Sequence, residues 1–300
     1  MRIVMAGSSG FLGTHLRRRL TKDGHEIVQL VRRQPTEPDQ RRWWPDRGEL
    51  DPAALEGADA VINLAGAGVE DKRWTESYKD ILRSSRVGAT ATIATALAAL
   101  PAGERPAVLL NGSAIGFYGD TGDTAVDEQS PSGAGFFPEL CRAWEAATTR
   151  AEDAGLRVVR LRTGFPLDKS GGLLKPLLLP FRFGVGGKLA NGRQWMPWIS
   201  LADWLSAAAF LLGREDVAGP VNMVGPDPAR NADFTKALGK ALHRPAIAPV
   251  PTLALRILLG EFANEAVASQ RVLPGVLNRA GFAYQHRDLD SALRAALRVV

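Results

Sequence analysis

The sequence predicts an α/β protein with a Rossmann-type, doubly wound parallel sheet and a smaller, mainly helical C-terminal lobe. Two observations carry this prediction. Short apolar runs alternate with helical segments up to about residue 165, and the first run ends in the glycine-rich stretch GSSGFLG. Strands that alternate with helices imply right-handed crossovers and a parallel sheet that is covered on both faces.

The alternation begins at the N-terminus. RIVMAG is typical of a buried strand, THLRRRLTKDGH has helical periodicity, and EIVQLVRR is typical of a second strand. Residues 1–33 therefore predict one βαβ unit. Further strands are expected at ADAVINLAG, AVLLNGSA and LRVVRLRTG, with the helices ESYKDILRSSRVGATATIATALAAL and FFPELCRAWEAATTRAEDAG between them. Functional residues are expected just after the strands, because ligands bind at the carboxyl ends of such a sheet.

The pattern changes after this point. Residues 166–197 are rich in Gly and Pro and too irregular for another βα unit, and WISLADWLSAAAFLL then predicts a strand and a helix. Asp203 in that segment is expected to hold a loop by hydrogen bonds. We therefore expect a Rossmann domain at residues 1–165 and 198–225, and a substrate-binding C-terminal lobe at 166–197 and 226–300.

The composition limits the class of protein. The chain is 45% hydrophobic and 23% charged, as is usual for a globular protein. It has neither the start of a signal peptide nor an apolar run near the ~20 residues of a membrane span, so a cytoplasmic location is expected. The single cysteine, Cys141, excludes an internal disulfide, and the four histidines lack metal-ligand spacing, so no metal is expected.

The formal net charge of +5 does not by itself indicate nucleic acid. The arginines are scattered, usually with acids nearby in the sequence, and no nucleic-acid-binding motif accompanies them. A solvated surface and a site for an anionic small molecule explain the charge, so neither nucleic acid nor a membrane is expected as a partner.

The stretch GSSGFLG places Gly7, Gly10 and Gly13 between a strand and a helix. Gly7 permits a tight turn, Gly10 lets the backbone approach a pyrophosphate, and Gly13 lets the helix pack on the strand. A glycine-rich loop alone is also compatible with a plain turn, but its place here predicts dinucleotide binding. The other expected cofactor-binding residues of this loop are Ser9, Phe11 and Leu12.

The second strand ends in QLVRRQ, which contains Arg32 and Arg33. Sites for NAD usually place an acidic side chain here to bind the ribose 2′-hydroxyl, whereas arginine accommodates a 2′-phosphate. The two arginines therefore favour NADP (NADPH) over NAD as the cofactor. The alternative is that they are ordinary surface cations.

With these features, the chain resembles the extended short-chain dehydrogenase/reductases, through the glycine-rich start, NLAG and GSAIGFYG. More narrowly, DKRWTESYKDILRSSRVGAT, CRAWEAA and QRVLPGVLNRAGF resemble the atypical epimerase-family proteins that carry a C-terminal domain of unknown function. The resemblance spans nearly the whole chain and implies an NAD(P)-binding fold. The further positions expected to contact the cofactor are Asn63, Leu64, Ala65, Gly66, Ser113 and Arg162.

The resemblance also implies a catalytic set. In the superfamily, a Ser or Thr polarises a substrate oxygen, and a Tyr four residues before a Lys is the acid/base, with its pKa lowered by the Lys. Ser113 matches the Ser position. Counting back eight residues from Glu145 places Phe137 at the Tyr position and Cys141 at the Lys position. Phe137 carries no proton and Cys141 no positive charge, so the usual pair is absent; Cys141 is expected to be a small buried side chain.

Other residues are candidates for the missing roles. Tyr118 in GFYG is the nearest phenol and a candidate catalytic residue; the alternative is a packing role. Lys72 and Arg73 are expected to approach a substrate anion or, alternatively, to be surface charges at a helix start. Arg193 and Gln194, at the mouth of the variable lobe, are expected to contact the substrate.

Two hypotheses about function remain open. The first is an enzyme, an NADP(H)-dependent oxidoreductase or nucleotide-sugar-epimerase-like protein with an unidentified small-molecule substrate. A missing acid/base typically costs ~10²–10⁴-fold in rate, so slow turnover would survive. The second is a non-catalytic NADP(H) sensor or regulatory protein. We favour the enzyme, because Ser113 and a covering lobe are needless for sensing alone. The resemblance also makes a homodimer plausible, through helices near residues 75–100 and 136–154.

Overall fold

The computed structural model describes residues 1–298, except for the side chains of residues 258 and 259. The chain divides into two compact units. Unit 1 comprises Met1–Ser113, Glu139–Leu161 and Ala208–Pro220, and unit 2 comprises Ala114–Pro138, Arg162–Ala207 and the chain from Val221 onward. The domain division expected from the sequence stays a prediction, because compactness alone does not define a substrate-binding domain, and its residues 299 and 300 lie outside the described residues.

Unit 1 contains most of the large sheet and the helices that cover it. The strands of this sheet are β1 (Arg2–Ala6), β2 (Glu26–Val31), β3 (Gln40–Trp44), β4 (Glu49–Leu50), β5 (Ala60–Asn63), β6 (Val108–Ala114), β8 (Arg157–Thr163) and β12 (Gly219–Met223). The helices wholly or partly in unit 1 are α1 (Phe11–Lys22), α2 (Glu76–Arg83), α3 (Ala89–Ala99), α4 (Phe136–Ala146), α5 (Thr149–Asp153) and α7 (Leu201–Leu212). A π-helical turn, Ser84–Gly88, joins α2 to α3, and short 3-10 turns lie at Pro45–Arg47, Pro52–Leu55 and Ala102–Glu104.

The strand order confirms the predicted fold class. The sheet runs β12-β8-β6-β5-β1-β2-β3-β4, and β1 pairs in parallel with both β2 and β5. The chain therefore starts in the middle of the sheet, moves out through β2 and β3, and returns to the other side of β1, as in Rossmann folds. The neighbouring loops after β1 and β5 meet at one edge, which is the site expected for a ligand.

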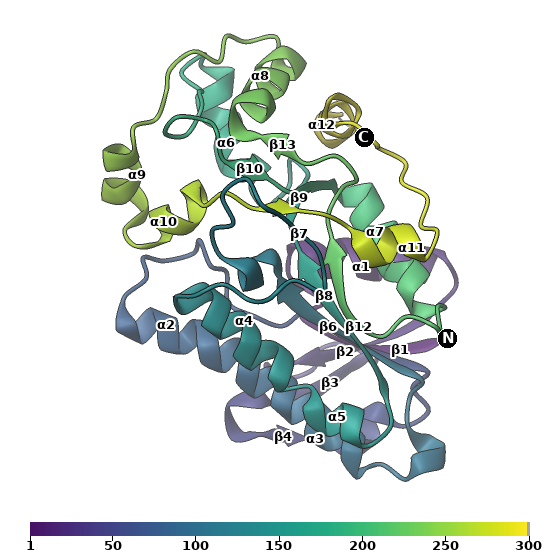
Figure 1. Cartoon of the computed structure of the whole chain (residues 1–300). Coiled ribbons are helices and arrows are strands. Elements are labelled where there is room, and N and C mark those ends of the chain that lie inside the picture. Colours follow the sequence, from purple (N-terminus) through teal and green to yellow (C-terminus); the bar gives the residue numbers. More distant parts are fainter. Residues whose placement is uncertain (299–300) are drawn as a thin grey trace. The chain divides into compact units, whose positions relative to one another are not determined.

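The two faces of the sheet are covered by different helices (Figure 1). Val4 of β1 packs in one core with Ile93 of α3. Because successive side chains of a strand point to opposite faces, Ile3 lies on the other face. Leu16 of α1 is fully buried, as is Ile3. The doubly wound arrangement follows from these alternating apolar positions.

Strand β3 was not expected from the sequence. Its residues Arg41 and Arg42 are exposed, whereas Trp43 is buried with an exposed fraction of 2%. β3 pairs with β2 in parallel and with the short β4 in antiparallel fashion. Near the edge of a sheet, one face of a strand is often open to solvent and carries charged residues. Arg41 and Arg42 therefore hide the apolar pattern by which such a strand is predicted.

Unit 2 contains short strand pairs and most of the C-terminal helices. Its elements are the 3-10 turn Ile115–Tyr118, β7 (Ala125–Val126), β9 (Phe165–Leu167), α6 (Leu174–Arg182), β10 (Trp195–Met196), β11 (Trp198–Ser200), β13 (Ala229–Arg230), α8 (Asn231–Leu242), α9 (Thr252–Leu259), α10 (Phe262–Val267), β14 (Arg271–Val272), α11 (Gly275–Arg279) and α12 (Leu289–Leu297). The prediction of a mainly helical C-terminal segment is confirmed.

Helix α6, which follows β9, corrects the expectation that residues 166–197 are too irregular for another βα unit. Leu174, Leu178 and Phe181 are buried at helical spacing, in one core with Phe234 of α8. The helix forms although Pro180 lies inside it. Burial of this apolar face outweighs the poor helix propensity of proline. The prediction from the sequence gave too much weight to the Gly and Pro content of this segment.

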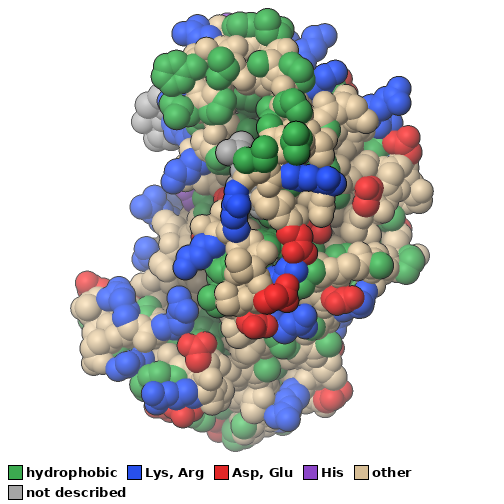
Figure 2. Space-filling model, turned by 90° about the vertical axis from the view of Figure 1, so that its left-hand side faces the viewer, with side chains coloured by type: hydrophobic (Ala, Val, Ile, Leu, Met, Phe, Trp, Pro, Cys, Tyr) green, Lys and Arg blue, Asp and Glu red, His purple; other side chains and the backbone are tan. Residues whose placement is uncertain are grey.

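Several large apolar side chains of unit 2 are exposed, and Figure 2 shows apolar side chains gathered over the upper part of one face. The exposed ones are Leu179, Phe183, Val185, Ile247, Leu253 and Ile257. Within residues 1–298, no helix has both the length and the apolar character needed to cross a membrane.

Candidate cofactor and active site

The glycine-rich turn after β1 is shaped by two glycines that the packing requires. Gly7 has a φ of +75°, and a Cβ there would lie 2.4 Å from the backbone carbon of Leu64. A Cβ on Gly13 would lie 2.0 Å from the carbonyl oxygen of Gly7. Both distances are far below any real contact, so these glycines fix the tight turn and the close approach of α1 to β1.

Gly10 is different, because the fold itself does not require a glycine there. Its backbone is extended, with φ −71° and ψ 176°, and the nearest atom to an added Cβ is 3.5 Å away. Gly10 is the N-cap of α1, and as a glycine it offers no side-chain acceptor to the amides of the first turn. The first-turn amides and the helix dipole are therefore available to an anion, and the predicted pyrophosphate contact of Gly10 is compatible with this geometry and stays a prediction.

The neighbouring serines have different roles. Ser8 is buried and donates a hydrogen bond from Oγ to Oε1 of Gln29 at 2.9 Å, whereas Ser9 is exposed at the turn. Phe11 and Leu12, in the first turn of α1, are partly buried. The predicted cofactor contacts of Ser9, Phe11 and Leu12 are compatible with these positions and stay predictions.

The end of β2 carries an exposed basic group. Arg32 and Arg33 are both exposed just after the strand, and Nη1 of Arg33 donates to Oγ1 of Thr36 at 2.8 Å. The carboxylate of Asp39 accepts a 2.8 Å hydrogen bond from Nε2 of Gln29. Both guanidinium groups therefore remain accessible at the edge of the sheet where a 2′-phosphate is expected.

The NLAG segment after β5 is held by a buried polar network. Nδ2 of Asn63 donates to Oγ1 of Thr90 at 3.0 Å and to Oδ1 of Asn111 at 2.7 Å. Oδ1 of Asn63 accepts from the amide of Ala65 at 3.1 Å. The side chain of Asn63 thus orients the turn from inside. Leu64, Ala65 and Gly66 follow it at the carboxyl end of β5, and the cofactor contacts expected of these four residues stay predictions.

Ser113, at the end of β6, is paired with a carboxylate that the sequence analysis gave no role. Its Oγ donates a 2.7 Å hydrogen bond to Oε1 of Glu145 on α4. The exposed fractions are 4% for Ser113 and 7% for Glu145. A hydroxyl can donate one hydrogen bond, and here the carboxylate accepts it. Ser113 can donate to a substrate oxygen only when this bond to Glu145 is broken, so its predicted role carries that condition.

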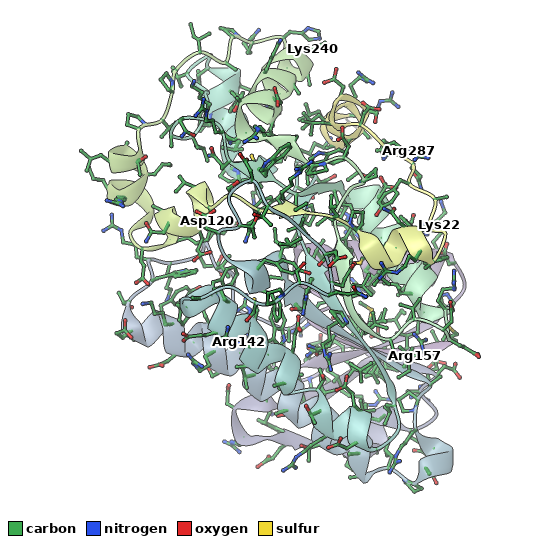
Figure 3. The ribbon with its side chains drawn as sticks, in the orientation of Figure 1. Lys22, Asp120, Arg142, Arg157, Lys240 and Arg287 are labelled. Carbon is green, nitrogen blue, oxygen red and sulfur yellow. The ribbon has the colours of Figure 1, made fainter. Side chains whose placement is uncertain are left out.

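Helix α4 has neither of the two usual catalytic side chains. Phe137 packs on Gly116, where an added Cβ would lie 2.3 Å from the ring. Cys141 is fully buried, which confirms the expected small buried side chain. Arg142, labelled in Figure 3, lies on the exposed side of α4 and does not take the place of a buried lysine.

A buried cation does lie in this region of unit 1, but it comes from the π-helical turn rather than from α4. Arg86 has an exposed fraction of 8%. Its Nη2 donates to the carbonyl of Ala67 at 2.9 Å, and its Nη1 donates to the carbonyl of Leu82 at 3.3 Å. The centre of the guanidinium lies 5.1 Å from the ring of Trp144 on α4. Arg86 was not predicted from the sequence, where nothing distinguishes it from the nearby Arg83.

Arg86 also lies directly against the NLAG turn. A Cβ built on Gly66 would be 3.3 Å from Cζ of Arg86. Burial lowers the pKa of the Arg86 guanidinium, and the first of the neighbours that oppose this shift is Cys141. The residue therefore lies between the end of β5 and the face of α4 that carries Trp144.

Lys72 and Arg73 line a shallow hollow of about 290 Å³ in unit 1. Its lining residues are Lys72, Arg73, Thr75, Ser77, Tyr78 and Ile81. Tyr78 is tied to the loop by a 2.6 Å hydrogen bond from its hydroxyl to the carbonyl of Gly68. The two predicted substrate contacts are thus brought together and exposed, and their role stays a prediction.

Tyr118 lies in a buried cluster of unit 2. Its hydroxyl donates to Oδ1 of Asn222 at 2.7 Å and accepts from Nη1 of Arg162 at 2.9 Å. The Arg162 guanidinium lies 3.5 Å from the ring centre of Phe117. Burial raises the pKa of Tyr118 to about 12, so the phenol is protonated at neutral pH. These contacts favour the packing role, and the catalytic role of Tyr118 and the cofactor contact of Arg162 stay predictions.

The two predicted substrate contacts of unit 2 differ in exposure. Gln194 is 6% exposed, and its Nε2 donates to the carbonyl of Leu189 at 3.2 Å, whereas Arg193 is exposed. Next to them, the guanidinium groups of Arg230 and Arg271 lie 4.3 Å and 5.0 Å from the ring centre of Trp195. This aromatic and basic cluster was not predicted, because its arginines come from distant segments.

Within residues 1–298, no group of three or more His, Cys, Asp or Glu side chains is placed to hold a metal ion. The candidate site is therefore described by its glycine-rich turn, its basic edge and the residues at the ends of β5 and β6.

The strand order and the glycine-rich turn define a Rossmann-type dinucleotide-binding protein. Residues 3–162 match the model of the NAD dependent epimerase/dehydratase family, and residues 250–296 match a domain of unknown function, DUF1731. The chain belongs to the NAD dependent epimerase/dehydratase family. It is 42% identical to epimerase family protein Mb2239 of Mycobacterium bovis over 292 residues, covering 97% of this chain and 96% of the relative. It is 34% identical to human epimerase family protein SDR39U1 over 298 residues, covering 98% and 99% of the two chains.

Solved structures give the same result. A crystal structure of human SDR39U1, isoform 2, with NADPH matches with a TM-score of 0.91 at 31% identity, over 100% of both chains. A nucleoside-diphosphate sugar epimerase from Corynebacterium glutamicum matches with a TM-score of 0.82 at 34% identity, over 99% of this chain and 58% of that one. A UDP-galactose 4-epimerase matches with a TM-score of 0.71 at 18% identity, which shows the shared fold alone.

Proposed function

We propose that this protein binds NADP(H) and uses it as an oxidoreductase or nucleotide-sugar-epimerase-like enzyme on a small molecule that is still unidentified. The observation that carries the proposal is the glycine-rich turn. Gly7 and Gly13 are required by internal packing, whereas Gly10 is free of it and stands at an uncapped helix start. Close approach of a pyrophosphate explains a glycine at a position where the fold does not need one.

The choice of NADP over NAD rests on Arg32 and Arg33. Both are exposed at the end of β2, where a 2′-phosphate would approach. The similar human SDR39U1 was crystallised with NADPH. The residues proposed to bind the cofactor are Gly7, Ser9, Gly10, Phe11, Leu12, Gly13, Arg32, Arg33, Asn63, Leu64, Ala65, Gly66, Ser113 and Arg162.

The chemistry is hydride transfer, which the bound nicotinamide supplies. The chain's own residues orient the reactants and exclude water. We propose Ser113 as a catalytic hydroxyl, with Glu145 as the carboxylate that accepts its hydrogen bond, at 2.7 Å between Oγ and Oε1. Tyr118 remains a second catalytic candidate. Lys72, Arg73, Arg193 and Gln194 are the proposed substrate contacts. Loss of the usual acid/base costs ~10²–10⁴-fold in rate, so slow turnover is expected.

The alternative is a non-catalytic NADP(H) sensor. Two observations favour it. Helix α4 has neither tyrosine nor lysine, and the hydroxyl of Ser113 already donates its hydrogen bond to a buried carboxylate. In that case NADPH binds but is not consumed with any carbonyl substrate. A cytoplasmic location and a homodimer stay predictions of the sequence.

The first test is a titration of the purified protein with NADPH and NADH, followed by nicotinamide fluorescence. We expect selective binding of NADPH, weakened by Arg32→Ala and by Gly10→Asp. A screen of carbonyl compounds then follows NADPH absorbance, with Ser113→Ala as the catalytic control. Binding of neither nucleotide would contradict both functions at once.

A further inference from the structure

The site has a buried positive charge that the family motif does not explain. At the position of the usual lysine, α4 carries Cys141, which provides no cation. Arg86 is 8% exposed and lies 5.1 Å from the ring of Trp144, three residues along α4 from Cys141. A cation is therefore present on the same face of α4, although it comes from another segment.

The charge of Arg86 is only partly compensated. Its Nη1 and Nη2 donate to two backbone carbonyls, but its buried Nε has no hydrogen-bond partner within the described residues. Within the described residues no ion pair joins this guanidinium to a carboxylate, and its electrostatic neighbours are Cys141, Tyr78 and Asp71. Burying an unpaired charge is costly, so such a group is normally matched by a ligand or a counter-ion.

The surroundings of Arg86 place it where the ligand loops meet. Its Cζ would be 3.3 Å from a Cβ on Gly66, which follows β5. Trp144 packs on Gly112 of β6, where a Cβ would lie 2.9 Å from the indole. The guanidinium therefore lies beside the carboxyl ends of two central strands, and ligands of doubly wound sheets bind at that edge.

A local irregularity of the helix delivers this side chain. Arg86 lies in the π-helical turn Ser84–Gly88 between α2 and α3. Such turns insert an extra residue into a helix and are frequent at functional sites. Arg83, one turn earlier on α2, is exposed, whereas Arg86 is buried.

We propose that Arg86 replaces the missing lysine: its guanidinium binds the hydroxyl oxygens of the nicotinamide ribose of bound NADP(H) and supplies the positive charge of the site. The inference rests on the proposed NADP(H) binding. It explains why the chain tolerates Cys141 on α4, since a second cation beside Arg86 would be repelled. The planar guanidinium also offers several donors in a fixed arrangement, which suits a pair of vicinal hydroxyls.

The test uses two probes on the intact protein. NADPH carries the nicotinamide ribose, whereas 2′,5′-ADP carries only the adenosine half, with its 2′-phosphate. Arg86→Met keeps much of the side-chain volume and removes the charge, and Arg83→Met is the matched control on the exposed side of α2. We expect Arg86→Met to weaken NADPH binding about 10- to 100-fold and to leave 2′,5′-ADP binding unchanged. Arg83→Met should change neither.

A second variant tests the replacement directly. Cys141→Lys in the Arg86→Met background restores a cation from α4, and we expect it to recover most of the lost NADPH affinity. In the wild-type background the same change places two cations together and should lower both the affinity for NADPH and the melting temperature. Circular dichroism of each variant shows whether it folds.

The outcomes separate the two proposals. Wild-type protein that binds neither NADPH nor 2′,5′-ADP contradicts the proposed function, and the role of Arg86 fails with it. Wild-type binding with unchanged NADPH affinity in Arg86→Met overturns the role of Arg86 alone. Equal loss of both probes in Arg86→Met also overturns it, because Arg86 would then be a structural residue of the NLAG turn.

Discussion

Gly10 and Gly13 lie three residues apart, and the structure predicts a different effect when each is replaced by alanine. Gly13→Ala should lower the stability of the fold, whereas Gly10→Ala should lower the affinity for NADPH. A Cβ on Gly13 would lie 2.0 Å from the carbonyl oxygen of Gly7, against at least 3.4 Å for ordinary contact. The clash is with backbone, so α1 must move away from the turn by more than ~1 Å. Overpacking of this kind costs about 1–3 kcal/mol, and the helix propensity of alanine returns up to ~1 kcal/mol. We expect Gly13→Ala to lower the free energy of unfolding by about 2 kcal/mol.

Gly10→Ala should behave in the reverse way. The added Cβ meets only an ordinary contact of 3.5 Å with Gly7, so the free energy of unfolding should change by no more than about 0.5 kcal/mol. The same methyl group would occupy the space of the pyrophosphate, and the affinity for NADPH should fall at least ~10-fold, or about 1.4 kcal/mol.

Urea unfolding measures the stability of each variant, and nicotinamide fluorescence measures NADPH binding. A Gly10→Ala variant that binds NADPH as tightly as the wild type would refute the assignment of this turn to the pyrophosphate. A Gly13→Ala variant with wild-type stability would show that α1 adapts without cost, and the packing argument would then be wrong.

Three further predictions concern other residues. Burial raises the pKa of Tyr118 from 10.0 to about 12. The protonated phenol therefore contributes about 2–3 kcal/mol of stability that is present below pH ~10 and is lost as pH rises through ~12. Tyr118→Phe should make this loss of stability smaller, as measured by urea unfolding at several pH values. Arg32→Ala should weaken NADPH binding about 10-fold and leave NADH binding unchanged, and equal loss for both nucleotides would refute the 2′-phosphate contact. The buried carboxylate of Asp203 accepts from the amides of Gln285 and His286 at 2.6 and 3.1 Å. Asp203→Ala should therefore lower the free energy of unfolding by about 3 kcal/mol, and a change below ~1 kcal/mol would contradict its loop-holding role.

The fold was largely predictable because its signals are local. Alternating apolar runs and the glycine-rich turn indicate β1, α1 and β2 without any long-range information, and the structure confirms the sheet they imply. The strand β3 was not predicted, since Arg41 and Arg42 occupy its exposed positions and its buried residues are the polar Gln40 and Trp43. A strand with one covered face gives a weak apolar pattern, and only its pairing with β2 reveals it.

The candidate site was predictable only where one short segment carries it. The different roles of Gly7 and Gly13 follow from their spacing, and the structure supplies the distances. The bond between Ser113 and Glu145 joins residues of a strand and a helix, and no periodicity indicates that their side chains meet. The same holds for Tyr118 and Asn222, which are distant in the sequence but hydrogen-bonded at 2.7 Å.

Arg86 shows why a motif on one helix is an incomplete guide to an active site. The motif places its cation on α4, and Cys141 stands at that position in this chain. The chemistry of the site, however, depends on where a positive charge lies, not on which segment carries it. A π-helical turn in another segment brings Arg86 to the same face, 5.1 Å from Trp144. A lost lysine is therefore weak evidence of a lost function, because an electrostatic role can pass between segments that are adjacent only in the folded chain. Loss of the tyrosine is the stronger argument for changed chemistry, since a proton donor must contact the reacting oxygen itself.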